Sequence, residues 1–136
     1  MPLIPHERLR ALAERILLAA GVPANFAELV STTLVATNLR GTDSHGIQLL
    51  TFYVDQLLGG DMLAAETGRV VSESGTSMVY DASNGMGQVT ARICAGHAAR
   101  LARTHGMASS ARGTAITLAP PFGGRVRWLS RATSAS

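Results

Sequence analysis

The sequence has a single cysteine and no long run of apolar residues. Cys94 therefore has no partner for an internal disulfide, and only His97 lies near it, so no set of residues has the spacing of metal ligands. The longest apolar runs, such as 16–20, are too short to cross a bilayer. These absences argue against a disulfide scaffold. From them we predict that the chain has no metal site and no membrane partner. Cys94 itself is expected to be a buried helix residue.

Residues 1–7 contain no basic segment followed by an apolar stretch, so no secretory signal is expected and the predicted location is cytoplasmic. Hydrophobic residues make up 46% of the 136 residues, and the mean hydropathy is +0.19. This composition predicts a globular chain with a core rather than a disordered one, and the length suits one modest domain.

Acidic residues are absent after residue 106, which explains the overall charge. The formal net charge of +3 and the isoelectric point of 10.0 are values often found in nucleic-acid-binding proteins. Residues 1–106, however, contain eight arginines and nine acidic residues, so the whole excess of positive charge comes from the last segment. That segment has only Phe122 and Trp128 as aromatics and no recognised binding motif. We therefore predict no nucleic-acid partner.

Apolar residues at helical spacing predict three helices before any strand. The first is expected over 6–20. The second is expected over 25–38, with a capping box formed by Asn25 and Glu28. The third is expected to begin at the Ser-His-Gly element and to end at the paired glycines, over 44–60. Together these helices predict an N-terminal helical subdomain over residues 1–60.

Two short β-prone segments, 70–73 and 77–81, surround a Ser-Gly-Thr sequence, which predicts a hairpin. A turn at 84–87 then leads into a helix over 88–105 whose apolar residues are typical of a helix that covers a sheet. The predicted fold class is α+β, a helical segment followed by the start of a mixed sheet, with 61–107 as the start of an α/β catalytic domain that is truncated.

Gly85 and Gly87 resemble part of a dinucleotide-binding fingerprint. Thr90, however, occupies the place of the third glycine, and no βαβ unit of parallel strands is expected around this turn. We therefore interpret the glycines as a plain turn, and the cofactor-binding residues stay unknown.

The most informative segment is 40–46, which reads Arg-Gly-Thr-Asp-Ser-His-Gly and places an acid, a hydroxyl and an imidazole between two glycines. Asp43 or Ser44 is expected to cap the following helix, which would place His45 beside free backbone N–H groups that favour anions. A histidine in that position suits acid–base chemistry on a small acidic substrate. The spacing alone leaves a plainer alternative, in which Ser44 only caps a helix and His45 is a surface residue.

Other short motifs accompany this segment in order: Leu34–Leu39, Tyr53-Val54, Leu57–Gly60, Val70–Glu73, Asp81, Asn84–Gln88 and Ala102–Met107. With them, the sequence resembles the N-terminal part of the malate/L-lactate dehydrogenase family. This group includes ureidoglycolate, sulfolactate and piperideine-carboxylate reductases and is unrelated to the Rossmann-type lactate dehydrogenases. The resemblance implies an oxidoreductase that uses NAD or NADP, acts on a small-molecule 2-hydroxy or 2-oxo acid, and is a homodimer in its full-length form.

The resemblance carries over two residues, His45 and Ser44, as catalytic and substrate-binding groups. It implies that His45 exchanges a proton with, or hydrogen-bonds, the substrate oxygen or carboxylate, while Ser44 helps to orient it. Asp43 is a candidate to tune the imidazole, in a direction that the sequence leaves open. Many relatives have a basic residue five positions after the motif serine, where it can hold the substrate carboxylate. Leu49 occupies that position here, which leaves the substrate class open.

After Met107 the family pattern stops. Similar proteins continue with a valine-rich pair and then Arg-Asn-Ser-Asn-His-Phe-Gly, which bears a second functional histidine. Codons read one base out of register permit Val-Val at 109–110 and that histidine at the position of Thr117. We therefore predict that 108–136 is translated out of frame and that this fragment is inactive alone. The alternative is a genuine divergent tail, with an extended loop at 120–124 and a short strand at 126–129.

A second functional class also stays open, a small non-catalytic helical module for interaction or dimerisation. Truncation of the sheet would leave the hairpin and the last helix uncovered, so exposed apolar surface is expected.

Overall fold

The computed structural model describes residues 3–113 and 128–131. Its elements in chain order are α1 His6–Ala19, α2 Ala24–Leu39, the 3₁₀ turn η1 Asp43–His45, α3 Leu49–Gly59, β1 Arg69–Ser74, β2 Ser77–Asp81, α4 Gly87–His105, β3 Ser109–Gly113 and β4 Trp128–Arg131. They form two compact units, Met1–Ala65 and Glu66–Ser136. The predicted α+β class is confirmed, since three helices precede a mixed sheet and its covering helix.

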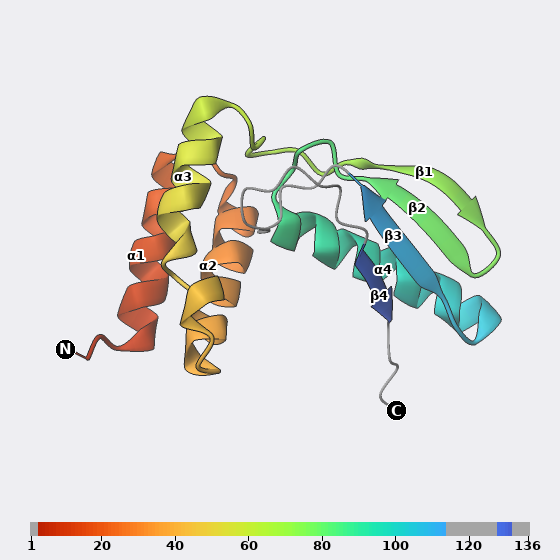
Figure 1. The fold of residues 1–136 in the computed structure, drawn as a ribbon, viewed down its shortest axis with the longest axis horizontal. Coiled ribbons are helices and arrows are strands. Elements are labelled where there is room, and N and C mark those ends of the chain that lie inside the picture. The colour runs from red at the N-terminus through yellow and green to blue at the C-terminus, as the bar shows by residue number, and fades with distance from the viewer. Residues whose placement is uncertain (1–2, 114–127, 132–136) are drawn as a thin grey trace. The chain divides into compact units, whose positions relative to one another are not determined.

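In the first unit, α1 packs against α2 and also contacts α3 (Figure 1). The core lies along these contacts, and Leu17, Val30 and Leu34 are at most 1% exposed. Tyr53 of α3 is also buried and supplies the largest side chain of this core. Burial of such residues along one face of each helix is what stabilises the bundle.

The predicted capping box at the start of α2 is wrong. The helix begins at Ala24, and Pro23 precedes it with no side-chain cap. The backbone N–H groups of Phe26 and Ala27 donate to the Pro23 carbonyl at 3.0 and 2.9 Å. Pro23 is the N-cap residue, and its φ of −55° is already close to the helical value, so Asn25 falls inside the first turn instead of before it.

The third predicted helix is divided in two. Its expected start forms the separate 3₁₀ turn η1, and α3 begins only at Leu49. Gly46 has φ −96° and ψ −144°, a non-helical conformation that interrupts the helical backbone between the two. The predicted end is confirmed, because α3 ends at Gly59 and Gly60 follows in the left-handed conformation with φ +80°.

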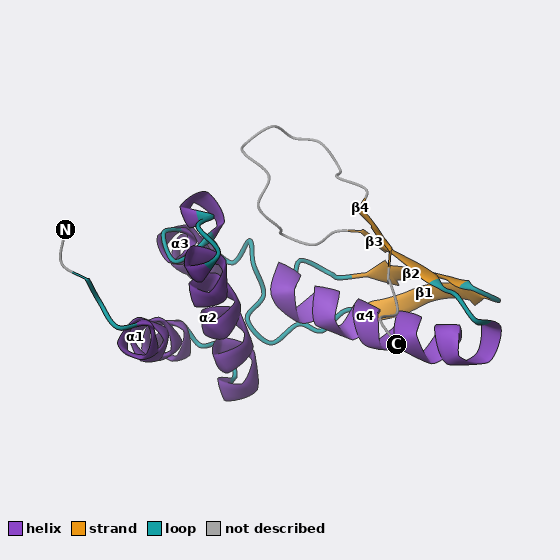
Figure 2. Ribbon diagram, turned by 90° about the horizontal axis from the view of Figure 1, so that it is seen from below, coloured by secondary structure: helices purple, strands orange, loops and turns teal. Residues whose placement is uncertain are grey.

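The second unit is a four-stranded sheet in the order β1-β2-β3-β4 with α4 along one face (Figure 2). β1 and β2 form the predicted hairpin, which is antiparallel and has a bulge between Val70 and Ser72. β2 and β3 are parallel, and α4 connects them. The expectation that no βαβ unit surrounds the 84–87 turn is therefore wrong. The sequence 109–113 reads Ser-Ser-Ala-Arg-Gly, which lacks the β-branched and aromatic residues that indicate a strand.

The core of the second unit lies between the sheet and α4. Met78 and Tyr80 of β2 pack with Cys94 and Leu101 of α4. Cys94 is only 4% exposed, which confirms the prediction of a buried helix cysteine, and burial raises the pKa of its thiol. Ser110 of β3 is buried as well, and its hydroxyl has no hydrogen-bond partner within the part of the chain that the structure describes.

Apolar side chains remain exposed on the hairpin. Val70, Val71 and Val79 are 39 to 56% exposed, and every residue of β1 is exposed. Val79 alternates with the buried Met78 and Tyr80, so it lies on the face of β2 opposite to α4. This agrees with the expected uncovered surface. Among the described residues, no helix combines the length and apolar character needed to span a membrane.

Candidate functional site

The turn η1 carries Asp43, Ser44 and His45 between the end of α2 and the start of α3. All three side chains are exposed, whereas the following Gly46 is buried. The backbone is closed by two hydrogen bonds, from His45 N–H to the Thr42 carbonyl at 3.2 Å and from Gly46 N–H to the Asp43 carbonyl at 3.0 Å. The turn thus holds its three side chains at the surface of the first unit.

Ser44 and His45 are in direct contact, with Ser44 Oγ 2.9 Å from His45 Nδ1. This is an ordinary hydrogen-bond length. A neutral imidazole has one donor and one acceptor nitrogen, so a bond at Nδ1 decides what Nε2 can do. When Ser44 donates to Nδ1, the ring proton is on Nε2, which is then the nitrogen available to a ligand.

The predicted capping role of Asp43 or Ser44 is wrong. Neither η1 nor α3 has a side-chain cap, and Gln48 precedes α3. His45 therefore ends a short 3₁₀ turn instead of lying at the N-terminus of an α-helix. Attraction of an anion by a helix dipole consequently gives no support to this site, and its chemistry depends on the hydroxyl and the imidazole themselves.

Asp43 is bonded to a residue that the sequence reasoning missed. Asn38 Nδ2 donates to Asp43 Oδ1 at 2.6 Å, and Ile47 N–H donates to Asn38 Oδ1, also at 2.6 Å. Within the described residues, no hydrogen bond or ion pair joins Asp43 to His45, so Asp43 acts on the shape of the turn. No local pattern singles out Asn38, because its role depends on contacts with residues five and nine positions later.

Leu49, which occupies the position of a basic residue in many relatives, is the first residue of α3 and is half-buried. Its alkyl side chain cannot pair with a carboxylate, so any cation that holds the substrate must come from another position. Thr117, the predicted place of the second histidine, and the predicted loop at 120–124 lie outside the described residues. The alternative strand at 126–129 overlaps β4 in its last two residues.

The 84–87 turn does not fit a nicotinamide nucleotide. A Cβ on Gly85 would lie 2.7 Å from the Glu66 carbonyl oxygen, so this glycine is needed for protein packing rather than for the approach of a phosphate. Thr90, at the place of the third glycine, is fully buried and its hydroxyl contacts the Met86 carbonyl at 3.2 Å. Arg112 donates to the Gly87 carbonyl at 2.6 Å. The start of α4 is therefore closed by the chain's own contacts.

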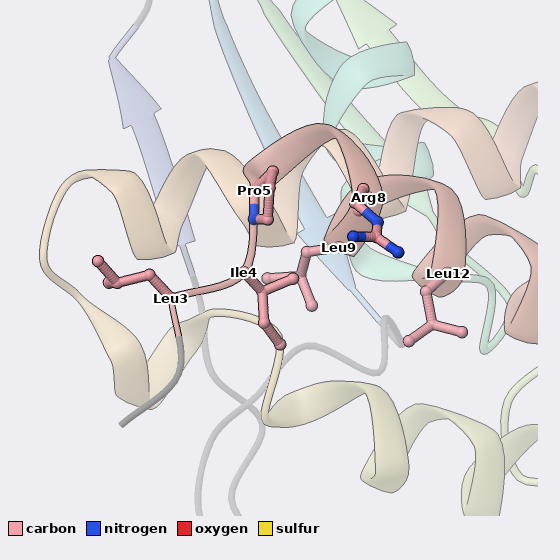
Figure 3. Close-up of a pocket in the computed structure, with 6 residues that line it drawn as sticks. All are labelled: Leu3, Ile4, Pro5, Arg8, Leu9 and Leu12. Atoms are coloured by element: carbon pink, nitrogen blue, oxygen red, sulfur yellow. The ribbon is translucent and has the colours of Figure 1, made fainter.

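A separate groove of about 420 Å³ lies at the start of the first unit (Figure 3). It is lined by Leu3, Ile4, Pro5, Arg8, Leu9 and Leu12. Arg8 is its one charged residue, and it contains no hydroxyl or imidazole, so it offers no acid–base group. The described residues also include no group of three or more histidine, cysteine or acidic side chains that could hold a metal ion.

Comparison with known proteins places these features in a family. The malate/L-lactate dehydrogenase family matches residues 4–115, so the match extends through β3 and past Met107, where the family pattern was expected to stop. Malate dehydrogenase from Pyrococcus horikoshii is 37% identical over 86 residues, 63% of this chain and 24% of that protein. Hydroxycarboxylate dehydrogenase B from Escherichia coli O157:H7 is 30% identical over 105 residues, 77% of this chain and 29% of that protein.

Solved structures of dehydrogenases also resemble this chain. Sulfolactate dehydrogenase from Methanocaldococcus jannaschii matches with a TM-score of 0.80 and 27% identity, over 84% of this chain and 33% of that one. The chain thus spans between about a quarter and a third of the length of these relatives. The resemblance first drawn from the 40–46 segment and its companion motifs is confirmed, and the chain belongs to the malate/L-lactate dehydrogenase family.

Proposed function

We propose that this chain is the N-terminal portion of an NAD- or NADP-dependent oxidoreductase that interconverts a 2-hydroxy acid and a 2-oxo acid, with His45 and Ser44 as its acid–base pair. The observation that carries the proposal is the 2.9 Å contact between Ser44 Oγ and His45 Nδ1 in an exposed turn. Family membership supplies the reaction class, because the relatives are dehydrogenases of malate and other hydroxycarboxylates.

The pair is suited to the proton half of this reaction. When a 2-oxo acid is reduced, its carbonyl oxygen gains a proton from Nε2–H of the charged His45 ring, which leaves a neutral ring with its proton on Nδ1; in the reverse direction the free Nε2 of that ring accepts the proton. Ser44 can support both states, because its hydroxyl oxygen accepts from Nδ1–H before and after the proton leaves Nε2. Ser44 therefore holds the ring in one orientation while the proton moves.

The proposal of a nicotinamide cofactor rests on family membership alone. The 84–87 turn does not fit it, so the residues that bind the nucleotide are expected elsewhere in the full-length protein. Because this chain spans about a quarter to a third of its relatives, we propose that it does not turn over substrate alone. A cytoplasmic location and a homodimeric full-length form remain predictions.

A chimaera tests the proposed roles. Residues 1–107 would replace the matching segment of the Pyrococcus horikoshii malate dehydrogenase, and malate oxidation would be measured with each nicotinamide nucleotide. We expect His45→Ala to lower kcat/KM by about 100-fold or more, the range for loss of a general acid–base group. Ser44→Ala, which removes one orienting hydrogen bond, should lower it about tenfold.

The control is His6→Ala, because His6 is an exposed histidine at the start of α1 whose Nε2 lies 3.0 Å from Oε1 of the neighbouring Glu7. This variant should stay within about twofold of the parent chimaera, since surface substitutions away from a site have small effects. An active chimaera in which His45→Ala and His6→Ala behave alike would show that His45 is a surface residue and would reject the proposal.

The second candidate is a non-catalytic helical module for self-association, and the groove of Figure 3 favours it. Leu3, Ile4 and Leu12 are 98, 60 and 52% exposed, an apolar surface of the kind found at interaction sites. A purified chain that forms stable dimers in sedimentation velocity, combined with an inactive chimaera that is properly folded, would favour this module over the enzyme fragment.

A further inference from the structure

Asn38 lies in the last turn of α2 and reaches both sides of the turn that carries Ser44 and His45. Its amide nitrogen donates to the Asp43 carboxylate, and its amide oxygen accepts from the Ile47 backbone N–H; each distance is 2.6 Å. The backbone carbonyl of Asn38 also accepts from Gly41 N–H at 2.8 Å. One side chain therefore binds the chain immediately before Ser44 and immediately after Gly46.

The amide can satisfy these partners in one orientation only. A carboxylate needs a donor and a backbone N–H needs an acceptor, so the nitrogen must face Asp43 and the oxygen must face Ile47. The bond to Asp43 involves an ionised acceptor and belongs to the stronger class of hydrogen bonds. These two hydrogen bonds thus fix the orientation of the Asn38 amide as well as the backbone of the turn.

Gly46 fits against this amide. It is buried, and a Cβ built on it would overlap the side chain of Asn38. Space therefore accounts for the absence of a side chain at this position. Asn38 and Gly46 are consequently matched to each other on either side of the Ser44–His45 contact.

We propose that Asn38 is a positioning residue for the acid–base pair: it holds the 43–47 backbone so that Ser44 Oγ stays at His45 Nδ1 and leaves Nε2 to the substrate. The catalytic meaning of this role rests on the proposed function above. The positioning itself is a property of the free chain and can be measured without substrate or cofactor.

The test uses nitrogen-15 NMR of the histidine rings in the 136-residue chain, recorded at alkaline pH. In the parent chain we expect His45 to be enriched in the Nδ1–H tautomer, in which Nδ1 donates to Ser44 Oγ and Nε2 is free, with a nuclear Overhauser effect between Ser44 Hβ and His45 Hε1. Asn38→Ala should abolish that effect and move the tautomer ratio to the value of the exposed His105 in α4. His105 and the overall helix content serve as controls for folding.

A reciprocal exchange keeps the test decisive if Asn38→Ala fails to fold. In the double variant Asn38→Asp/Asp43→Asn, the new carboxylate can accept from Ile47 N–H and from the new amide, so both bonds are restored. We expect this double variant to recover the His45 signature, whereas Asn38→Asp alone, which places two carboxylates together, should lose it.

The steric match gives a further measurement. Gly46→Ala alone should lose the His45 signature, because the methyl group displaces Asn38. In the Asn38→Ala background the same change should add no further effect, since the overlapping atoms are gone. A folded Asn38→Ala variant with the parent signature, or a reciprocal double variant that does not recover it, would overturn the positioning role. Failure of the chimaera experiment would instead reject the catalytic role of His45 and leave this result unchanged.

Discussion

Ser44 and His45 are consecutive residues, so their contact depends on the conformation of one turn rather than on the packing of distant elements. That conformation is set by Asn38, which lies five residues before Asp43 and is bonded to it. The pair therefore needs only α2 and the start of α3 to take its shape. At the scale of single residues, the first unit already holds the group that the proposed reaction requires for proton transfer.

Ser110 supplies a prediction at the same scale. It lies opposite Met78 in the parallel pairing of β2 and β3, is 3% exposed, and its hydroxyl lacks a partner among the described residues. A buried hydroxyl without a hydrogen bond costs about 1–3 kcal/mol. We expect Ser110→Val to raise the free energy of unfolding by about 1–2 kcal/mol, measured by urea denaturation.

Ser109→Val is the matched control, because Ser109 precedes Ser110 in the same strand and is exposed. It should change the free energy of unfolding by no more than about 0.5 kcal/mol. Equal effects of the two substitutions would mean that the gain comes from the β-propensity of valine and not from removal of a buried hydroxyl. Ser110→Ala, which adds no bulk, separates that removal from overpacking.

At the scale of elements, the sequence predicted the helices, the hairpin and the α4 boundaries well, because each has its own apolar periodicity. It failed where a tertiary partner determines the conformation. β3 forms by backbone pairing with β2, although its Ser-Ser-Ala-Arg-Gly sequence has little strand character. The division between η1 and α3 depends on the side chain of Asn38, which no local pattern reveals. The Ser-His pair was therefore predictable, and the residue that shapes it was not.

Tyr80 of β2 joins two segments of the second unit through its hydroxyl. Its hydroxyl donates to the Thr67 carbonyl and ties the second strand to the segment before the first. Burial, and then the nearby Cys94 and Glu66, raises the pKa of this hydroxyl above 10.0, its ordinary value. We expect Tyr80→Phe to lower the free energy of unfolding by about 1 kcal/mol at neutral pH, again in urea.

The pH dependence of that loss follows from the raised pKa. The folded state holds the Tyr80 proton more tightly than the unfolded state, so the contribution is complete below pH 10.0 and is lost as the pH rises through the folded pKa. The difference between the parent and Tyr80→Phe should therefore shrink above that pH. A constant difference through the alkaline range would contradict a hydroxyl whose proton is held by the fold.

At the scale of the whole molecule, the family match covers most of the chain, whereas the excess positive charge lies in its last segment. Residues 4–115 match the family, yet all excess positive charge lies after residue 106. The buried Ser110 supports the hypothesis that this segment is translated out of frame, because a one-base shift permits valine at this position. Valine would place an apolar side chain at this buried position in place of the hydroxyl.

We therefore expect the coding DNA, sequenced from the codon of Gly106 to well past Ser136, to contain a second frame. That frame should encode Val-Val at 109–110, then Asn-His-Phe/Leu-Gly with histidine at the position of Thr117, followed by a long dehydrogenase-like continuation. Sequencing of independent clones and of the transcript is the measurement. If no frame contains that continuation, the tail is genuine and the self-association module becomes the better explanation of the chain.

A bulge interrupts the pairing of β1 with β2 between Val70 and Ser72. β1 is an edge strand of the sheet, and edges with free backbone groups invite the addition of strands from other molecules. A bulge shifts the register and increases the local twist, so that a straight incoming strand cannot pair along the whole edge. The bulge at Val71 thus disfavours fibril growth from this edge of the sheet. Aggregation of the protein should begin instead from its exposed apolar faces.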